Sequence, residues 1–352
     1  MRTASVVLGV LVGGALGWSV RAWRSDPPVV AAARVSKVAS TRHEGRIVRG
    51  DVREWVHPVL ACELNHDAAD ARLEPVRLRL AEAVANARSA GGVDDIAVYV
   101  RDLVDGGAVG IDADHRFPPA SLLKTPVLMG VLRAAVSQPN LMSKKVKMPA
   151  AWPDSEVPPE GTLEVGREYS IAELVEAMIL KSDNDAKDLL ISALGSDLIL
   201  DVLKDFGLAQ GDMDMFARIV TPRTYARVFE ALYNAIYVEP DASSYALSLL
   251  ARSEFTAGIV QGTPEGVRVA NKFGYRIDDR ADPPKRFLHD CGIVYQPQRP
   301  FVLCIMTRGD TIKRLTQVVQ DIARVVYRAT SERTATKPRS DWPPPPPLPP
   351  PI

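Results

Sequence analysis

Ser121 and Lys124 are the side chains whose types and spacing most directly indicate chemistry. They stand three residues apart at the expected start of a helix, so the hydroxyl and the amine share one face about one turn apart. An amine that accepts the serine proton turns the hydroxyl into a nucleophile. The pair taken alone is equally compatible with a serine helix cap and a solvated lysine.

The residues on either side of this pair predict a rigid support. Residues 117–120 contain two prolines, and residues 125–132 are apolar enough to form a buried helix. A reactive pair on a buried helix keeps a fixed geometry, as catalysis requires.

Periodicity and turn signals along the rest of the chain predict a helix, two strands, a block of helices, three strands and a last helix. Besides the helix at Ser121, we expect helices over 73–87, 171–180, 185–193, 197–206, 222–235, 243–253 and 313–328, and strands over 96–100, 108–111, 267–275, 287–295 and 300–308. A two-stranded hairpin is marginal alone, so strands from both ends must share one sheet. The expected fold class is α/β (α+β): an antiparallel five-stranded sheet flanked by helices, with an inserted helical block.

The composition is that of a globular protein and excludes several classes of partner. Of the 352 residues, 46% are hydrophobic and 24% charged, and the 43 Lys and Arg balance the 43 Asp and Glu. With no net charge, no global field favours nucleic acid. Three cysteines are too few for a metal cluster or a disulfide framework, so we expect no metal and no cofactor.

The chain divides into four predicted segments. An uncharged run from residue 3 to residue 20 makes 1–23 a signal anchor or, as the less favoured alternative, a cleaved signal peptide. Residues 24–57 are read as a linker, 58–330 as the catalytic domain, and 331–352 as a disordered proline-rich tail. The arginines that follow the apolar run favour a cytoplasmic position for the domain by charge bias.

Two of the cysteines are expected to face each other. If residues 296–299 form a hairpin loop, Cys291 on one strand lies opposite Cys304 on the next. Two neighbouring buried thiols are the preferred interpretation, and a cross-strand disulfide is the alternative.

Two further motifs follow Ser121-x-x-Lys124 in the sequence: Ser182-Asp183-Asn184 and Lys272-Phe273-Gly274. In this order they resemble the signature of class A β-lactamases and penicillin-binding proteins. The resemblance covers roughly residues 92–330 and includes Leu163-x-x-Gly166, Asp188-Leu189-Leu190, Thr221-Pro222 and His289-Asp290-x-Gly292. It implies a β-lactamase or transpeptidase fold and favours the catalytic interpretation of Ser121.

Three residues are the expected catalytic groups. Ser121 would attack a carbonyl carbon and become acylated, and Lys124 would accept its proton. A lysine amid apolar helix and near a second lysine should have a depressed pKa. Ser182 would pass a proton to the leaving nitrogen, and the alternative role of its hydroxyl is to cap the helix that begins near Asp185.

Five residues are the expected substrate-binding groups. Asn184 has a donor and an acceptor suited to a substrate amide, and Lys272 would add positive charge opposite Ser182 unless it is a solvated strand lysine. The resemblance implies an oxyanion site made by the backbone N–H groups of Ser121 and Tyr275. Gly274 belongs to the same strand motif, and Arg276 is either a carboxylate ligand or solvated.

The chain departs from the family pattern at two places. Phe273 replaces a threonine whose hydroxyl helps to bind the substrate carboxylate. The stretch 207–218 contains no glutamate, the residue that activates the deacylating water in class A enzymes, and offers Asp212 or Asp214 as substitutes. Acylation should therefore proceed, whereas hydrolysis of the acyl-enzyme is in doubt.

The expected protein is a membrane-anchored serine hydrolase of the β-lactamase type, monomeric, with its domain outside the cytoplasm despite the charge bias. It would act on a small-molecule β-lactam through a Ser121 acyl-enzyme. The alternatives are a D-alanyl-D-alanine peptidase or penicillin-binding protein that acts on cell-wall peptide, and a membrane-tethered binding protein without turnover.

Overall fold

A computed structural model describes residues 47–49, 55–56, 59–62, 71–151, 161–208 and 220–336. Its main sheet has five antiparallel strands in the order β4-β3-β9-β8-β7, so strands from both ends of the domain share it as expected. The strands are β1 (Ile47–Arg49), β2 (Val59–Cys62), β3 (Val93–Asp102), β4 (Ala108–Ile111), β5 (Lys145–Lys147), β6 (Glu168–Ser170), β7 (Val269–Asp278), β8 (Lys285–Val294) and β9 (Phe301–Gly309). The helices are α1 (Glu74–Ser89), α2 (Lys124–Ser137), α3 (Ile171–Leu180), α4 (Asn184–Leu194), α5 (Asp197–Asp205), α6 (Pro222–Tyr233), α7 (Pro240–Ala251), α8 (Ile259–Gly262) and α9 (Ile312–Thr336), with 3₁₀ turns η1 (Ala71–Leu73), η2 (Ala120–Leu123) and η3 (Leu141–Ser143).

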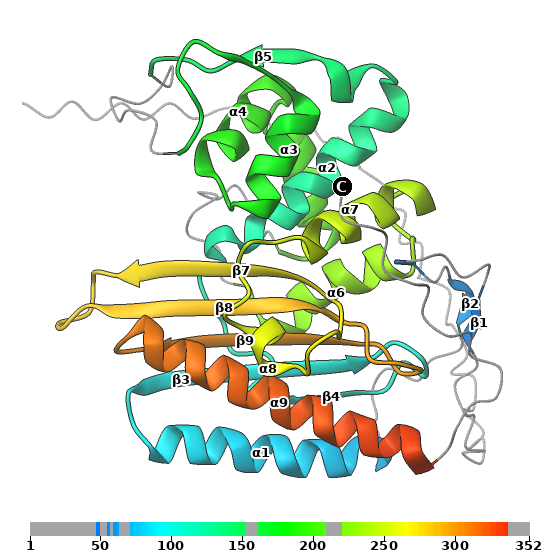
Figure 1. The fold of residues 1–352 in the computed structure, drawn as a ribbon, viewed down its shortest axis with the longest axis vertical. Coiled ribbons are helices and arrows are strands. Elements are labelled where there is room, and N and C mark those ends of the chain that lie inside the picture. The colour runs from blue at the N-terminus through cyan, green and yellow to red at the C-terminus, as the bar shows by residue number, and fades with distance from the viewer. Residues whose placement is uncertain are drawn as a thin grey trace, which may run out of the picture. The chain divides into compact units, whose positions relative to one another are not determined.

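Helices cover both faces of this sheet (Figure 1). On one face α1 and α9 lie side by side, because each carries apolar residues at helical spacing. Leu80 and Val84 of α1 and Leu315, Val319 and Ile322 of α9 are all buried in the same core cluster. The alternation of side chains along the strands supplies the other half of this core.

The block of helices covers the opposite face of the sheet and forms the second core cluster. Its central member is α2, which is buried along its first nine residues, Lys124–Leu132. Within the described residues, the stretch Ala120–Ser137 is long and apolar enough to cross a membrane by length and composition, but 56% of it is buried inside the protein. We therefore interpret α2 as the core helix of the domain, and it carries one end of the reactive pair.

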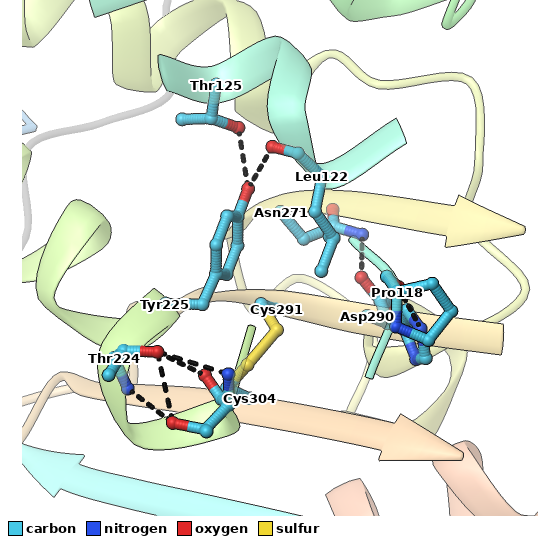
Figure 2. The surroundings of a disulfide bond; sticks show 11 residues. Pro118, Leu122, Thr125, Thr224, Tyr225, Asn271, Asp290, Cys291 and Cys304 are labelled. Carbon is cyan, nitrogen blue, oxygen red and sulfur yellow. Dashed lines mark hydrogen bonds between the residues drawn. A yellow bond between two sulfur atoms is a disulfide. The ribbon is translucent and has the colours of Figure 1, made fainter. Parts of the chain in front are cut away.

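The hairpin register places Cys291 directly opposite Cys304, as the loop length predicts. The preferred interpretation of two unbonded thiols is wrong, because the two cysteines form a disulfide (Figure 2). The physical reason is the closeness of directly paired residues in an antiparallel ladder, here 4.0 Å between the Cα atoms.

The predicted domain boundaries need correction at both ends. The supposed linker, residues 24–57, contains β1, which pairs with β2 of the predicted domain, and its Trp55 and Val56 are buried in the core. At the other end α9 continues to Thr336, past the expected start of the tail, and Arg333 pairs with Asp102 and Asp105 from the β3–β4 hairpin. The segments 1–46 and 337–352, and with them the anchor and most of the tail, lie outside the described residues.

Candidate active site

Ser121 lies in the 3₁₀ turn η2, directly before α2, rather than in the first turn of the α-helix itself. The preceding Ala120 has φ of 48°, a left-handed conformation that is uncommon for a residue with a side chain. Such conformations persist where the surroundings enforce them and cluster at functional sites. Gly274 of β7 provides part of that enforcement, because a Cβ there would lie 3.1–3.3 Å from Pro119 and Ala120.

The amine of Lys124 is the centre of the site. Lys124 is 1% exposed, and its Nζ lies 3.1 Å from Ser121 Oγ and 3.2 Å from Ser182 Oγ. The same Nζ donates to Ser182 O at 2.5 Å and to Asn184 Oδ1 at 2.7 Å. The turn that carries Ser121 and the distant loop that carries Ser182 thus both contact the Lys124 amine.

This arrangement suits a neutral amine. A neutral lysine has two N–H donors and one lone pair, and the site offers two groups that only accept, Ser182 O and Asn184 Oδ1. When both N–H groups serve these oxygens, the lone pair is left for a hydroxyl. The chemistry available to Lys124 is therefore removal of the Ser121 proton.

The pKa of Lys124 supports that role. Burial lowers it from the ordinary lysine value to about 8, and the positive charge of Lys187 acts in the same direction. The carboxylates of Asp183 and Asp188 partly oppose this shift. A base whose pKa lies near neutrality is deprotonated in a useful fraction of molecules.

Ser182 also has a left-handed backbone, with φ of 59°. Its hydroxyl does not cap α4, since Asp183 is the residue whose side chain accepts from the helix, at Ala186 N. Asp183 also accepts from both N–H and hydroxyl of Thr162, which ties the loop to the neighbouring segment. The Ser182 hydroxyl is thereby free to lie between two lysines.

The second lysine is Lys272 of β7, whose Nζ lies 2.9 Å from Ser182 Oγ. It is fully buried, which rules out the solvated alternative. Burial, and then repulsion from Lys124, lowers its pKa to about 7. Its Nζ also lies 4.3 Å from the centre of the Phe273 ring, which stacks on Phe255. The aromatic face favours the charged form of Lys272.

Lys272→Met should remove a pH dependence of stability. Because the folded pKa lies below the unfolded value near 10.5, the unfolded chain binds more protons between pH 7 and 10 and the free energy of unfolding rises with pH. We expect urea titrations to show a wild-type rise from pH 7 to 9.5 that exceeds that of the variant by on the order of 2 kcal/mol. Equal slopes would mean that Lys272 titrates normally in the fold.

The remaining expected site residues lie on or beside β7. Tyr275 and Arg276 have exposed side chains directly after Gly274, so Arg276 lies on the same face of the strand as Lys272 but apart from the lysine cluster. Asp212 and Asp214 fall outside the described residues. Within the described part of the chain, no group of three or more His, Cys, Asp or Glu side chains is placed to hold a metal ion.

Sequence reasoning missed two buried polar residues behind the nucleophile. Tyr225 of α6 contacts Leu122 and Thr125, and His289 of β8 contacts Pro118. His289 stood in a motif of the resemblance, but its partner is a backbone carbonyl 171 positions away. The available signal was the pair His289 and Asp290 within the apolar second half of β8.

Comparison with known proteins agrees with the fold and with the motifs. Residues 79–330 match the model of the "Beta-lactamase enzyme family". A β-lactamase of Streptomyces fradiae is 34% identical over 122 residues, a match that spans 34% of this chain and 38% of that protein.

Solved structures also share the fold. A variant of PBP-A, solved as an acyl-enzyme complex with penicillin G, has a TM-score of 0.62 and 20% identity, and the match covers 72% of this chain and 97% of that one. A β-lactamase of Sphaerobacter thermophilus has a TM-score of 0.61 and 24% identity, with 74% and 98% covered.

Proposed function

Because the chain belongs to the β-lactamase enzyme family, we propose that it is an active-site-serine hydrolase that opens β-lactam amides through an acyl-enzyme on Ser121. The observation that carries this proposal is the convergence of Ser121, Ser182 and Asn184 on the buried Lys124 amine. Breakdown of β-lactam antibiotics, and resistance to them, would follow from such an activity.

The reaction begins with attack of Ser121 Oγ on the lactam carbonyl. Lys124 takes the hydroxyl proton, and a carbon–oxygen ester bond forms as the lactam carbon–nitrogen bond breaks. The leaving nitrogen receives a proton through the Ser182 hydroxyl, which lies 3.2 Å from Lys124 Nζ and 2.9 Å from Lys272 Nζ. One proton is thus relayed from nucleophile to leaving group, and the amine is restored.

Other groups are proposed to bind the substrate and to stabilise the negative charge of the transition state. Lys272 supplies positive charge next to Ser182, and Asn184 faces the substrate amide. The backbone N–H groups of Ser121 and Tyr275 are proposed to hold the oxyanion. Contact between Gly274 and the Ser121 turn supports this pairing, because it brings the two segments together. Arg276 is proposed to meet a substrate carboxylate from its exposed position on β7.

The pH profile of acylation should be bell-shaped. Attack requires neutral Lys124, a fraction that rises with pH through about 8, and substrate binding requires charged Lys272, a fraction that falls through about 7. Both amines contact one hydroxyl, so they titrate as a pair, and we expect the maximum between about pH 7 and 8. Labelling rates with fluorescent penicillin from pH 5.5 to 10 would test this.

Lys272→Arg provides the control for this profile, since guanidinium keeps its charge throughout the range. The alkaline decline should disappear in that variant while the acid limb remains. A wild-type rate that climbs steadily to pH 10 would contradict a role for charged Lys272.

The second candidate is a penicillin-binding peptidase that forms the acyl-enzyme and releases it slowly. The sequence favours this candidate because residues 177–229 contain no glutamate, the residue that activates the deacylating water in class A enzymes. A general base for the deacylating water must then be Asp212, Asp214 or a group outside the family pattern. A binding protein without turnover is the third candidate, and the assembled lysine–serine cluster opposes it.

One experiment separates these candidates. The protein is mixed with a chromogenic cephalosporin and, separately, with labelled penicillin. Sustained colour that depends on Ser121 supports a β-lactamase, and a stable adduct after one burst of colour supports the peptidase. If neither colour nor an adduct appears, the binding protein is the one candidate that remains.

We also propose that residues 1–23 anchor the protein to a membrane as a signal anchor, with the domain, a monomer, on the extracytoplasmic side. The Cys291–Cys304 disulfide supports this location, because disulfides persist in oxidising compartments. Fractionation of cells with and without residues 1–23 would test the anchor, and protease accessibility in intact cells would test the side.

A further inference from the structure

The turn that carries Ser121 is held from both ends by buried polar side chains of other elements. It is a short 3₁₀ turn with a left-handed Ala120, so it has fewer internal hydrogen bonds than an α-helix of several turns. Its carbonyls at Pro118 and Leu122 lie on either side of the nucleophile.

His289 of β8 holds the end before Ser121. Its side chain is fully buried, and Nε2 lies 3.0 Å from Pro118 O. A carbonyl only accepts, so Nε2 carries the hydrogen in this contact. Burial lowers the pKa of His289 to about 4, and the ring remains neutral and keeps one tautomer near neutrality. Phe117 packs edge-on against the ring at 5.3 Å, which fixes its orientation.

Tyr225 of α6 holds the end after Ser121. Its side chain is 1% exposed, and the hydroxyl donates to Leu122 O at 2.7 Å. The Tyr225 hydroxyl oxygen also lies 3.1 Å from Thr125 Oγ1, in the first turn of α2. Figure 2 shows the phenol reaching from α6 to both groups.

We propose that His289 and Tyr225 are positioning residues that bracket the Ser121 turn and fix the nucleophile relative to Lys124. The inference rests on the proposed acylation at Ser121. Neither side chain is in contact with Ser121 or the lysines among the hydrogen bonds described, so each acts through a backbone carbonyl. The Ser121 Oγ to Lys124 Nζ distance of 3.1 Å leaves little slack, because a misplacement of about 1 Å costs roughly a hundredfold in rate.

Tyr225→Phe and His289→Leu test this positioning role, because each variant removes one hydrogen-bond donor to the turn. We expect the acylation rate at saturating penicillin G to fall by about 10- to 100-fold, with the dissociation constant of the non-covalent complex changed by less than about threefold. His289→Gln keeps an N–H donor and should recover part of the rate.

Tyr169→Phe is the matched control, because it removes a buried phenol hydroxyl that accepts from Glu164 N, away from the turn. It should lower the melting temperature about as much as Tyr225→Phe and leave the acylation rate at the wild-type value. A loss of rate that merely follows the loss of stability across all variants would overturn the proposal, as would wild-type rates in Tyr225→Phe and His289→Leu.

Amide hydrogen exchange of the peptide covering residues 117–125 gives a second readout that needs no substrate. Exchange should be faster in Tyr225→Phe and His289→Leu, and unchanged in Tyr169→Phe. If the wild-type protein forms no adduct, the proposed function fails, but the exchange measurement still tests whether Tyr225 and His289 position the turn. Unchanged exchange in both variants would reject that positioning role.

Discussion

The Ser121→Ala variant should fold like the wild-type protein and form no covalent adduct with penicillin. The substitution removes one half-buried hydroxyl and leaves the Lys124 contacts to Ser182 and Asn184 in place. Among the described residues, Ser182 Oγ is the other hydroxyl bonded to the Lys124 amine, and we expect it not to replace Ser121 because it also accepts from Lys272. Gel fluorescence with labelled penicillin and a thermal melt measure the two halves of this result.

Ser248→Ala is the matched control for that loss. Its hydroxyl is half-buried in α7 and bonds to Tyr245 O, so the variant loses a comparable group outside the site. It should label like the wild-type protein. Labelling that persisted in Ser121→Ala would point to a different nucleophile, with Ser182 the first to check.

Lys124→Met should acylate about 10³- to 10⁴-fold more slowly than the wild-type protein, since a positioned general base contributes on the order of 10² to 10⁴ and activates the nucleophile as well. Methionine matches the length of the lysine stem and suits a buried helix position, so we expect the fold to persist. Stopped-flow acylation with the chromogenic cephalosporin measures the rate.

Lys181→Met is the control, because Lys181 is exposed and stands directly before Ser182. Its acylation rate should match that of the wild-type protein. The acid limb of the pH profile should vanish in Lys124→Met, since the base that titrates near 8 is gone. A fall of less than tenfold would assign the base to another group.

The sequence predicted the fold class and the site cluster because both depend on local patterns. Apolar periodicity located α1, α3 and α9, and a capping box of Ser170 and Glu173 begins α3. The hairpin loop length set the register of β8 and β9. Motif order indicated which distant residues meet at Lys124, and the predicted depression of its pKa is confirmed in direction.

What the sequence could not supply depends on contacts between distant segments. The length of α9 reflects ion pairs of Arg333 with Asp102 and Asp105, more than 220 positions away. The pairing of two cysteines predicts proximity but not the bond, and the preferred thiol interpretation was wrong for that reason. The contacts of Tyr225 and His289 were not predicted, because their partners are backbone carbonyls of a distant segment.

The structure also shows what Phe273, which departs from the family pattern, contacts. The ring stacks on Phe255 and lies beneath the Lys272 amine, so it supports the charge of a neighbouring site residue. The threonine hydroxyl of the family pattern has no counterpart at this position. We therefore propose that binding of the substrate carboxylate depends on Lys272 and Arg276.

The most direct test of the central claim is to identify the residue that carries the acyl group. Intact wild-type protein is mixed with penicillin G at pH 7.5, quenched in acid at intervals, digested and analysed by mass spectrometry. The account predicts one penicillin per chain, on the peptide that contains Ser121 and on its hydroxyl, at the earliest times. An adduct on any other residue, or unmodified protein at every time with no penicillin consumed, would contradict it.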